Sequence, residues 1–326
     1  MDLATSERAF PLLGVVGPTA SGKSALAVEL ARRFGGEIVN CDSMQVYRGL
    51  DVGTAKPDAG LRREIPHHVL DVADVDEVFS AGRYQKLARA ALEDIRSRGR
   101  LPVVAGGTGF YLRALLYGIF EGPGRDEGFR RRLQTIVERR GPETLHRILA
   151  RRDPESARRV TPRDHQRLAR ALEVLHLTGR PMSEHFGVAE SPLDGFSPLL
   201  LCLGPPRAAL CERIDRRVLE MLDAGWVDEV RALLDRGVSP ASKGLEAIGY
   251  REIVAFLRGE ATWLATVEAI RAATRRYAKR QQTWFRKERD LVRLEGFGDD
   301  PSLREAAFQQ VETRFPRAVP ARANGV

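Results

Sequence analysis

The chain has 326 residues, 43% hydrophobic and 29% charged, and a net charge of +8; this is typical of a water-soluble protein of about two domains and favours a polyanionic partner. Its three cysteines, Cys41, Cys202 and Cys211, lack Cys-x-x-Cys spacing, which argues against a disulfide framework or a structural zinc site and favours the cytoplasm. The apolar run Leu12–Val16 is too short for a signal peptide or membrane span, so we expect no membrane association.

The first predicted elements are a strand at Leu12–Val16 and a helix at Lys23–Phe34. The loop between them consists of Gly17, Pro18, Thr19, Ala20, Ser21, Gly22, Lys23 and Ser24. A glycine-bounded loop in this position points backbone N–H groups and the positive end of the helix dipole at an anion. Lys23 can neutralise that anion and the Ser24 hydroxyl can ligate Mg²⁺, so the loop predicts a di- or triphosphate site. The weaker alternative is a glycine-rich turn that holds no ligand.

Strand and helix signals continue to alternate up to residue 120. In chain order they predict strand Glu37–Cys41, helix Tyr84–Arg98, strand Leu101–Ala105 and helix Tyr111–Tyr117. This βαβ alternation predicts an α/β fold with a parallel sheet core flanked by helices.

Two polar segments should reach the carboxyl edge of that sheet, where open parallel sheets bind ligands. Asp42 follows the second predicted strand, and its spacing leaves three roles open: a helix cap or Asx turn, an Mg²⁺ ligand, or a general base. Thr108 follows another strand and either donates to a ligand oxygen or caps the next helix. His67 and His68 have no partner at metal-ligand spacing, so we expect them to be structural.

Strand signals stop after residue 120, and arginine-rich amphipathic patterns predict a helical insertion over residues 121–195. The apolar run Pro198–Leu203 predicts a buried strand that rejoins the sheet, and helices follow to Arg289. We therefore assign residues 1–120 and 196–295 to the core. Residues 296–326, with one weak helical stretch, are expected to be a mobile tail.

The segment 271–293 carries most of the excess charge, with nine lysines and arginines against two carboxylates. Tyr277, Trp284 and Phe285 are interleaved with these cations, which suits phosphate contacts combined with stacking on bases. The alternative is a solvated basic helix face whose aromatic side chains pack inward.

Six motifs, in order and in register from about residue 12 to 290, resemble those of the bacterial tRNA dimethylallyltransferase family. They are Gly-Pro-Thr-Ala-Ser-Gly-Lys-Ser (17–24), Asp-Ser-Met-Gln-Val-Tyr (42–47), Gly-Thr-Ala-Lys-Pro (53–57), Gly-Gly-Thr-Gly-Phe-Tyr (106–111), Gln-Arg-Leu-Ala-Arg-Ala-Leu-Glu-Val (166–174) and Ile-Gly-Tyr-Arg-Glu (248–252). Six motifs together are far more specific than the phosphate loop alone. Eukaryotic members carry an additional C-terminal zinc finger, and this chain lacks the cysteines and histidines for one.

The resemblance implies a P-loop NTPase-like core and transfer of a dimethylallyl group from dimethylallyl diphosphate to N6 of the adenosine 3′-adjacent to the tRNA anticodon (position 37). Diphosphate is the leaving group, Mg²⁺ the cofactor, and the enzyme a monomer. Asp42 matches the family's general base, Thr108 the threonine that bonds the bridging oxygen, and Arg217 the diphosphate-binding arginine.

The resemblance also implies that RNA is contacted by Asp42, Ser43, Met44, Gln45, Thr108, Arg130, Gln166, Arg167, Leu168, Ala169, Arg170, Lys279, Arg280, Gln281, Gln282, Thr283, Trp284, Phe285 and Arg286. The target nucleotide must leave the anticodon stack to react, at a cost of a few kcal/mol. We expect RNA and the prenyl donor to reach the reacting centre from opposite ends of a channel.

Three rival functions remain open at this point. A small-molecule kinase would leave the basic aromatic segment 271–293 unexplained. An isopentenyltransferase acting on free adenine nucleotides would not need the long helical insertion. An RNA-binding module with a relic phosphate loop would not need the intact Lys23 and Ser24.

Overall fold

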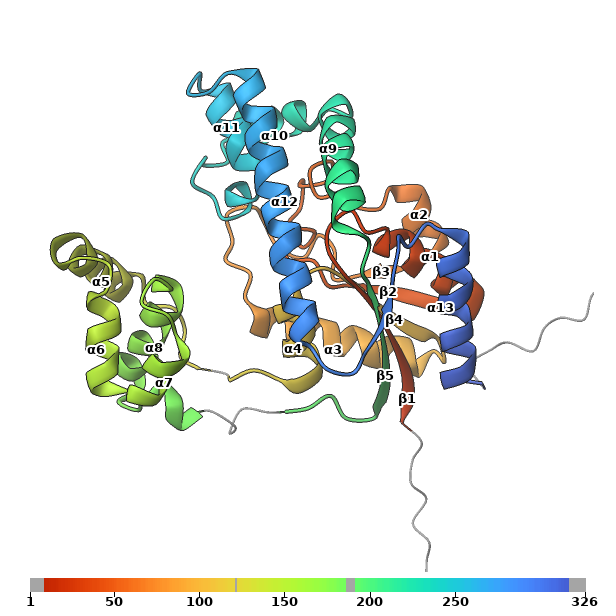
Figure 1. Cartoon of the computed structure of the whole chain (residues 1–326), viewed down its shortest axis with the longest axis horizontal. Helices are drawn as coiled ribbons and strands as arrows, with labels where there is room; N and C mark the ends of the chain where they lie inside the picture. The colour runs from red at the N-terminus through yellow and green to blue at the C-terminus, as the bar shows by residue number, and fades with distance from the viewer. Residues whose placement is uncertain (1–8, 121, 186–190, 317–326) are drawn as a thin grey trace, which may run out of the picture. The chain divides into compact units, whose positions relative to one another are not determined.

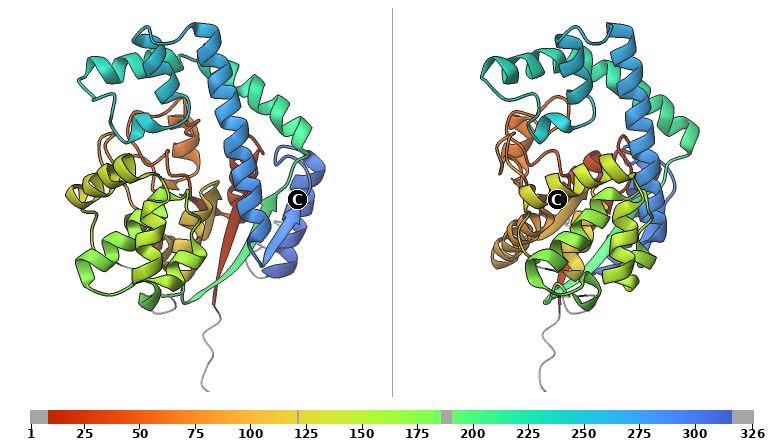
Figure 2. Two further views of the ribbon diagram at one scale, coloured as in Figure 1. Left: turned by 60° about the vertical axis from the view of Figure 1, so that its left-hand side comes forward. Right: turned by 90° about the vertical axis from the view of Figure 1, so that its left-hand side faces the viewer.

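The computed structural model describes residues 9–120, 122–185 and 191–316. The chain forms two compact units, each described by itself (Figures 1 and 2). The core unit comprises Met1–Leu116 and Leu193–Val326, and the helical unit comprises Tyr117–Pro192. Among the helices in the described part of the chain, none is both long enough and apolar enough to cross a membrane.

The core unit contains one six-stranded parallel sheet with strand order β3-β2-β4-β1-β5-β6. The strands are β1 (Phe10–Val16), β2 (Gly36–Asn40), β3 (His67–His68), β4 (Leu101–Gly106), β5 (Phe196–Leu203) and β6 (Leu291–Leu294). The predicted α/β class is confirmed, and β1, β2, β4 and β5 are the four predicted strands. The short edge strands β3 and β6 were missed, because two to four residues carry too little periodicity to be recognised.

Helices cover both faces of the sheet because alternate strand residues point to opposite sides. In β1, Leu12 and Val16 belong to one apolar cluster and Leu13 and Val15 to the other. The helices of the core unit are α1 (Lys23–Phe34), α2 (Ala59–Glu64), α3 (Ala81–Ser97), α4 (Gly109–Tyr117), α9 (Arg207–Asp223), α10 (Trp226–Asp235), α11 (Tyr250–Leu257), α12 (Trp263–Lys287) and α13 (Pro301–Arg314).

Helix α13 corrects the expectation of a mobile tail from residue 296. Its Leu303, Phe308 and Val311 are buried, and the helix runs beside α1, where the Phe34 and Phe308 rings meet edge to face at 6.0 Å (Figure 1). The stretch 301–314 is therefore part of the core. Its apolar pattern is weak by itself, and the surface that it covers comes from the start of the chain. Residues 317–326 lie outside the described part.

The described residues of the helical unit form only helices and one 3₁₀ turn, Met182–His185. The helices are α5 (Glu127–Arg140), α6 (Thr144–Arg152), α7 (Pro154–Arg159) and α8 (His165–Thr178). They enclose a small apolar core of their own, made mainly of Leu133, Leu145, Leu149, Leu168 and Leu172. A separate core is what allows such an insertion to fold as its own unit.

Candidate functional site

The phosphate loop lies where the sequence predicts it, between β1 and α1. Gly17 and Gly22 have φ values of +147° and +82°, which glycine adopts without strain. Gly22 is the residue before the first turn of α1, so the turn's free N–H groups open onto the loop. The Ser21 N–H donates to the Pro18 carbonyl at 3.3 Å and closes the loop on itself.

Lys23, Asp42 and Arg217 interact electrostatically beside this loop. Burial lowers the pKa of Lys23 to about 8; the nearby Asp42 opposes that shift and Arg217 adds to it. Burial also lowers the pKa of Arg217, again opposed by Asp42. Two partly buried cations near a single carboxylate leave an excess positive charge, which an incoming diphosphate would stabilise.

Asp42 is held in an Asx turn at the end of β2. Its N–H donates to Asn40 Oδ1 at 3.0 Å, and its Oδ1 accepts from the Met44 N–H at 2.9 Å. The Asx turn, one of the three roles that the sequence left open for Asp42, is therefore present. It also orients the Asp42 carboxylate for either of the other two roles, Mg²⁺ ligand or general base. Since one carboxylate can serve a turn and react, the turn does not exclude the general base.

Thr108 joins the loop after β4 to the Asp42 segment. Its N–H donates to the Cys41 carbonyl at 3.1 Å, and its Oγ1 accepts from the Ser43 N–H at 3.0 Å. The Tyr277 side chain of α12 lies beside the same threonine. A Cβ on Gly106 would lie 2.1 Å from the Cys41 carbonyl oxygen, so only glycine permits this approach of the two loops.

Helix α12 turns one face towards these loops and the other towards solvent. Gln281 and Phe285, 5% and 2% exposed, face inward, which departs from the RNA contacts expected for them. Helical periodicity is the reason, since a contiguous motif cannot lie on one face. The exposed residues of the expected RNA set on α12 are Lys279, Arg280, Thr283 and Arg286, while Gln282 and Trp284 are partly buried.

The helical unit places its expected RNA residues in two different environments. Gln166 and Arg167 are exposed, Ala169 is partly buried, and Leu168 is fully buried in the unit's core, so Leu168 is not a surface contact. Arg130 and Arg170 instead bind Glu173, a carboxylate with no exposed surface.

Glu173 is the electrostatic centre of the helical unit. Burial by itself raises its pKa, but hydrogen bonds from Arg130, Arg170 and the Asp126 N–H outweigh burial and lower the pKa to about 2. Arg130 and Arg170 are therefore already paired with a buried carboxylate of their own unit.

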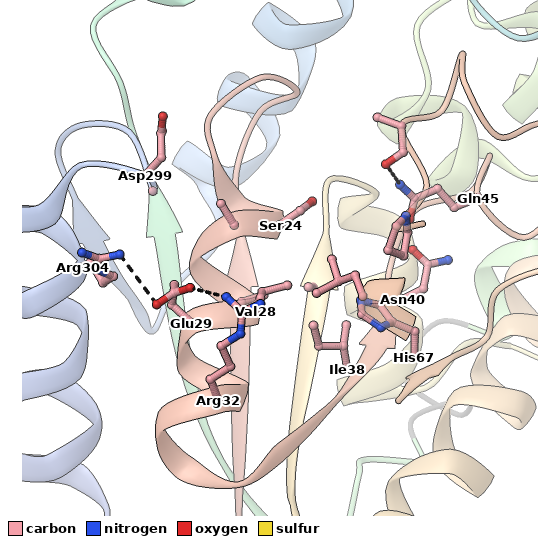
Figure 3. Close-up of a pocket in the computed structure, with 17 residues that line it drawn as sticks. Ser24, Val28, Glu29, Arg32, Ile38, Asn40, Gln45, His67, Asp299 and Arg304 are labelled. Atoms are coloured by element: carbon pink, nitrogen blue, oxygen red, sulfur yellow. Dashed lines mark hydrogen bonds and ion pairs between the residues drawn. The ribbon is translucent and has the colours of Figure 1, made fainter. Parts of the chain in front are cut away.

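A cavity of about 410 Å³ lies beside the first turns of α1, and Ser24 points into it (Figure 3). Asn40, Gln45 and His67 line its far side. Gln45 donates to the Thr54 carbonyl at 3.0 Å, so its amide is engaged within the protein. A larger cavity, of about 860 Å³, is lined in part by Arg217, which makes this arginine accessible from outside.

Mg²⁺ fits the residues present, although no group of three or more His, Cys, Asp or Glu side chains among the described residues could hold a metal. Mg²⁺ keeps several waters and usually binds through one or two protein oxygens together with substrate phosphates. The Ser24 hydroxyl is exposed in the first turn of α1 and offers one such hard oxygen.

Sequence reasoning missed Lys56 and Glu229, which shape the loop after Asp42. The Lys56 side chain is 1% exposed and bonds Asp51 and Asp71 at 2.8 and 2.6 Å. Glu229 accepts from the Val52 N–H at 2.7 Å. Lys56 lies in the motif at 53–57, so the sequence carried some indication of its importance. Glu229 lies in none of the motifs, and its partner Val52 is far away in the sequence, so no local pattern indicated its role.

Known proteins resemble the chain over almost its whole length. The tRNA dimethylallyltransferase of Solibacter usitatus is 50% identical over 302 residues, which cover 93% of this chain and 98% of that protein. That of Koribacter versatilis is 48% identical over 304 residues and covers 93% of this chain and 99% of its own.

Solved structures show the same likeness. A tRNA isopentenylpyrophosphate transferase from Bacillus halodurans superposes with a TM-score of 0.67 at 36% identity, covering 94% of this chain and 98% of that one. A eukaryotic dimethylallyltransferase acting on tRNA superposes with a TM-score of 0.77 at 29% identity, covering 97% of this chain and 82% of that one. The sequence profile described as IPP transferase matches residues 45–288. The chain therefore belongs to the IPP transferase family.

Proposed function

We propose that this protein is a tRNA dimethylallyltransferase, which moves the five-carbon group of dimethylallyl diphosphate to N6 of adenosine 37 in tRNA. The observation that carries the proposal is that Lys23, Asp42, Thr108 and Arg217 all belong to one site around the phosphate loop. The names of the relatives, all tRNA-modifying prenyl transferases, support it.

The leaving group is the diphosphate. Breaking the donor's C1–O bond builds negative charge on that oxygen, so preorganised donors and cations there lower the barrier. Lys23, Arg217 and the N–H groups of the phosphate loop supply them. Thr108 would donate a hydrogen bond to the bridging oxygen.

The nucleophile is the exocyclic N6 of the adenine, which loses a proton as its bond to C1 forms. Asp42 accepts that proton as general base. Its Asx turn fixes the carboxylate at the carboxyl end of β2, where the sheet edge presents it to the ligands of the phosphate loop. Asp42 and Lys23 partly offset each other's charge, which reduces the repulsion between the carboxylate and the diphosphate.

The donor carries two phosphates, and the Ser24 hydroxyl would help to hold Mg²⁺, which would supply further positive charge to the leaving group. The chain's own contribution is the Ser24 hydroxyl at the start of α1. We propose dimethylallyl diphosphate and Mg²⁺ as donor and cofactor on this ground.

We propose that tRNA is bound by exposed residues of both units. In the core unit these are Lys279, Arg280, Thr283 and Arg286 on the outer face of α12; Ser43 and Met44, which are partly buried, add contacts beside Asp42. In the helical unit they are Gln166 and Arg167. Cations on exposed faces bind phosphates without having to break contacts within the protein first.

The rival functions lack comparable support. The relatives named above are tRNA dimethylallyltransferases, and none is a small-molecule kinase. The helical unit, with a core of its own, would be superfluous in an enzyme that prenylates free nucleotides.

Nucleoside analysis tests the proposal. The purified protein is incubated with unmodified tRNA, dimethylallyl diphosphate and Mg²⁺, and the digested tRNA is analysed by mass spectrometry. We expect N6-isopentenyladenosine at position 37. Parallel reactions contain AMP in place of tRNA, or ATP with small acceptors. Prenylated AMP without prenylated tRNA, or phosphoryl transfer from ATP, would contradict the proposal.

A further inference from the structure

Gln281 is a buried amide in the C-terminal third of α12, and its side chain bridges two loops of the site. Its Oε1 accepts from the Thr19 N–H at 2.8 Å, and its Nε2 donates to the Gly107 carbonyl at 2.9 Å. A carboxamide carries both an acceptor and donors, so one side chain satisfies one backbone group in each loop.

The two loops belong to neighbouring strands. Thr19 lies in the phosphate loop after β1, and Gly107 precedes Thr108 in the loop after β4; β1 and β4 pair up to Val16 and Gly106. A Cβ on Gly107 would lie 2.2 Å from the Gln281 Nε2, so the glycine is what allows the amide to reach the backbone. The bridge therefore joins the residues expected to hold the diphosphate to the threonine expected to contact its bridging oxygen.

Residues on either side of Gln281 seat the same face of α12 on these loops. Tyr277, four residues earlier, lies beside Thr108. Trp284, three residues later, packs so closely on Gly109 that a Cβ there would lie 2.2 Å from its indole ring. Spacings of three and four place these side chains in one row along the helix.

We propose that Gln281 is a positioning residue for the diphosphate: it holds the phosphate loop, through the Thr19 amide, in register with the Thr108 loop. The identity of the donor rests on the function proposed above, whereas the role in binding diphosphate does not. A loop held in its binding conformation loses less conformational entropy when the ligand arrives, so affinity rises.

Two substitutions separate the parts of this bridge. Gln281→Met has similar length but neither donor nor acceptor, so both backbone groups lose their partner. Gln281→Glu retains an acceptor for the Thr19 N–H but cannot donate to the Gly107 carbonyl when ionised, and it adds a negative charge close to the loop. Gln310→Met makes the same chemical change on the exposed face of α13 and serves as the matched control.

The measurement is calorimetric binding of inorganic diphosphate with Mg²⁺, alongside binding of unmodified tRNA and the thermal midpoint. For Gln281→Met we expect diphosphate affinity to fall by about tenfold, the equivalent of one or two lost hydrogen bonds. Gln281→Glu should weaken it further. The affinity for tRNA should stay within about twofold, and Gln310→Met should match the wild type in both titrations. In the transfer assay, the KM for the donor should rise while the KM for tRNA does not.

Two results would overturn the proposal. One is a wild-type diphosphate affinity in Gln281→Met. The other is an equal loss of affinity for diphosphate and tRNA with a lowered thermal midpoint, which would make Gln281 a purely structural core residue. Failure of the proposed transferase activity would be recognised separately, as a wild-type protein that binds diphosphate but forms no isopentenyladenosine.

Discussion

The core unit and the helical unit use their partly buried cations in opposite ways. Around the phosphate loop, burial lowers the pKa of Lys23 and of Arg217, so each carries its charge at a cost until an anion arrives. In the helical unit, the hydrogen bond to Glu173 raises the pKa of Arg130, whose charge is already compensated. Arg170 shares the same carboxylate.

This contrast separates binding sites from structural ion pairs. A cation destabilised in the free protein gains most from a phosphate, whereas a cation paired with a buried carboxylate must give up that partner first. Arg130 and Arg170 match family positions expected to contact RNA, yet their nearest anion belongs to their own unit. Substitutions of the two carboxylates and of the exposed cations test this division.

Removing the carboxylate at the centre of the core site should have the largest effect. Asp42→Ala should lower turnover by roughly 10²–10⁴-fold while leaving tRNA affinity largely intact. Asp42→Asn is the sharper control, because its side-chain oxygen can still accept from the Met44 N–H and maintain the turn. Single-turnover kinetics and tRNA binding measure both. A large loss of tRNA binding with near-normal turnover would reassign Asp42 to recognition.

Removing the carboxylate of the helical unit should instead affect stability. Glu173→Ala leaves two arginines without their partner, at a cost of about 3 kcal/mol; the figure is at the low end for buried pairs because both arginines are partly exposed. Hydrogen exchange in α5–α8 measures it. Glu155→Ala, which removes an exposed pair with Arg159, should cost less than about 0.5 kcal/mol. Equal effects of the two substitutions would contradict the contrast.

Acid should weaken the same unit. The folded pKa of Glu173, about 2, lies below its ordinary value of 4.5, so its contribution to stability is complete above pH 4.5 and is lost as the pH falls towards 2. Exchange protection in α5–α8 should decline over that window, and Glu173→Ala should lack this part of the decline. An unchanged acid profile in the variant would show that other groups carry the effect.

The exposed cations of α12 should contribute to RNA binding. Lys279→Ala combined with Arg280→Ala should weaken tRNA binding by roughly tenfold and reduce the slope of log K against log salt by about 0.7–0.9 per lost phosphate contact. The control is Arg100→Ala, an exposed arginine at the amino end of β4, opposite the site. Titrations at several salt concentrations measure the slope, and an unchanged slope would exclude phosphate contacts by these two residues.

Donor binding should depend modestly on pH. With a pKa of about 8, Lys23 changes from mostly charged at pH 7 to mostly neutral at pH 9, so donor affinity should fall by up to roughly tenfold over that range. Lys23→Arg should flatten the profile because arginine stays charged. Titration with dimethylallyl diphosphate in the absence of tRNA measures it. The same pH profile in both proteins would mean that another group titrates.

Local patterns accounted for much of the site. The phosphate loop, the placement of Asp42 and Thr108 after strands, and the sheet itself all depend on contiguous residues whose spacing carries the information. Parallel strands bring their carboxyl ends to one edge, so their order along the chain was enough to predict that these loops meet.

Helix faces and long-range partners could not be predicted in the same way. Gln281 and Lys279 are two residues apart in one basic segment, but one bonds the phosphate loop and the other is exposed, and only the docking of α12 on the sheet decides which. Likewise, only the packing of α5 against α8 shows that Arg130 forms an ion pair with Glu173.

The amino-acid sequence alone thus determined the α/β core, the phosphate loop and the family, because each depends on short runs of contiguous residues that can be recognised without knowing the tertiary structure. The tertiary structure alone decided which cations are compensated, how the amide of Gln281 joins two loops, and that residues 301–314 complete the core. Burial and charge compensation depend on neighbours distant in the chain, and those neighbours are defined only once the chain has folded.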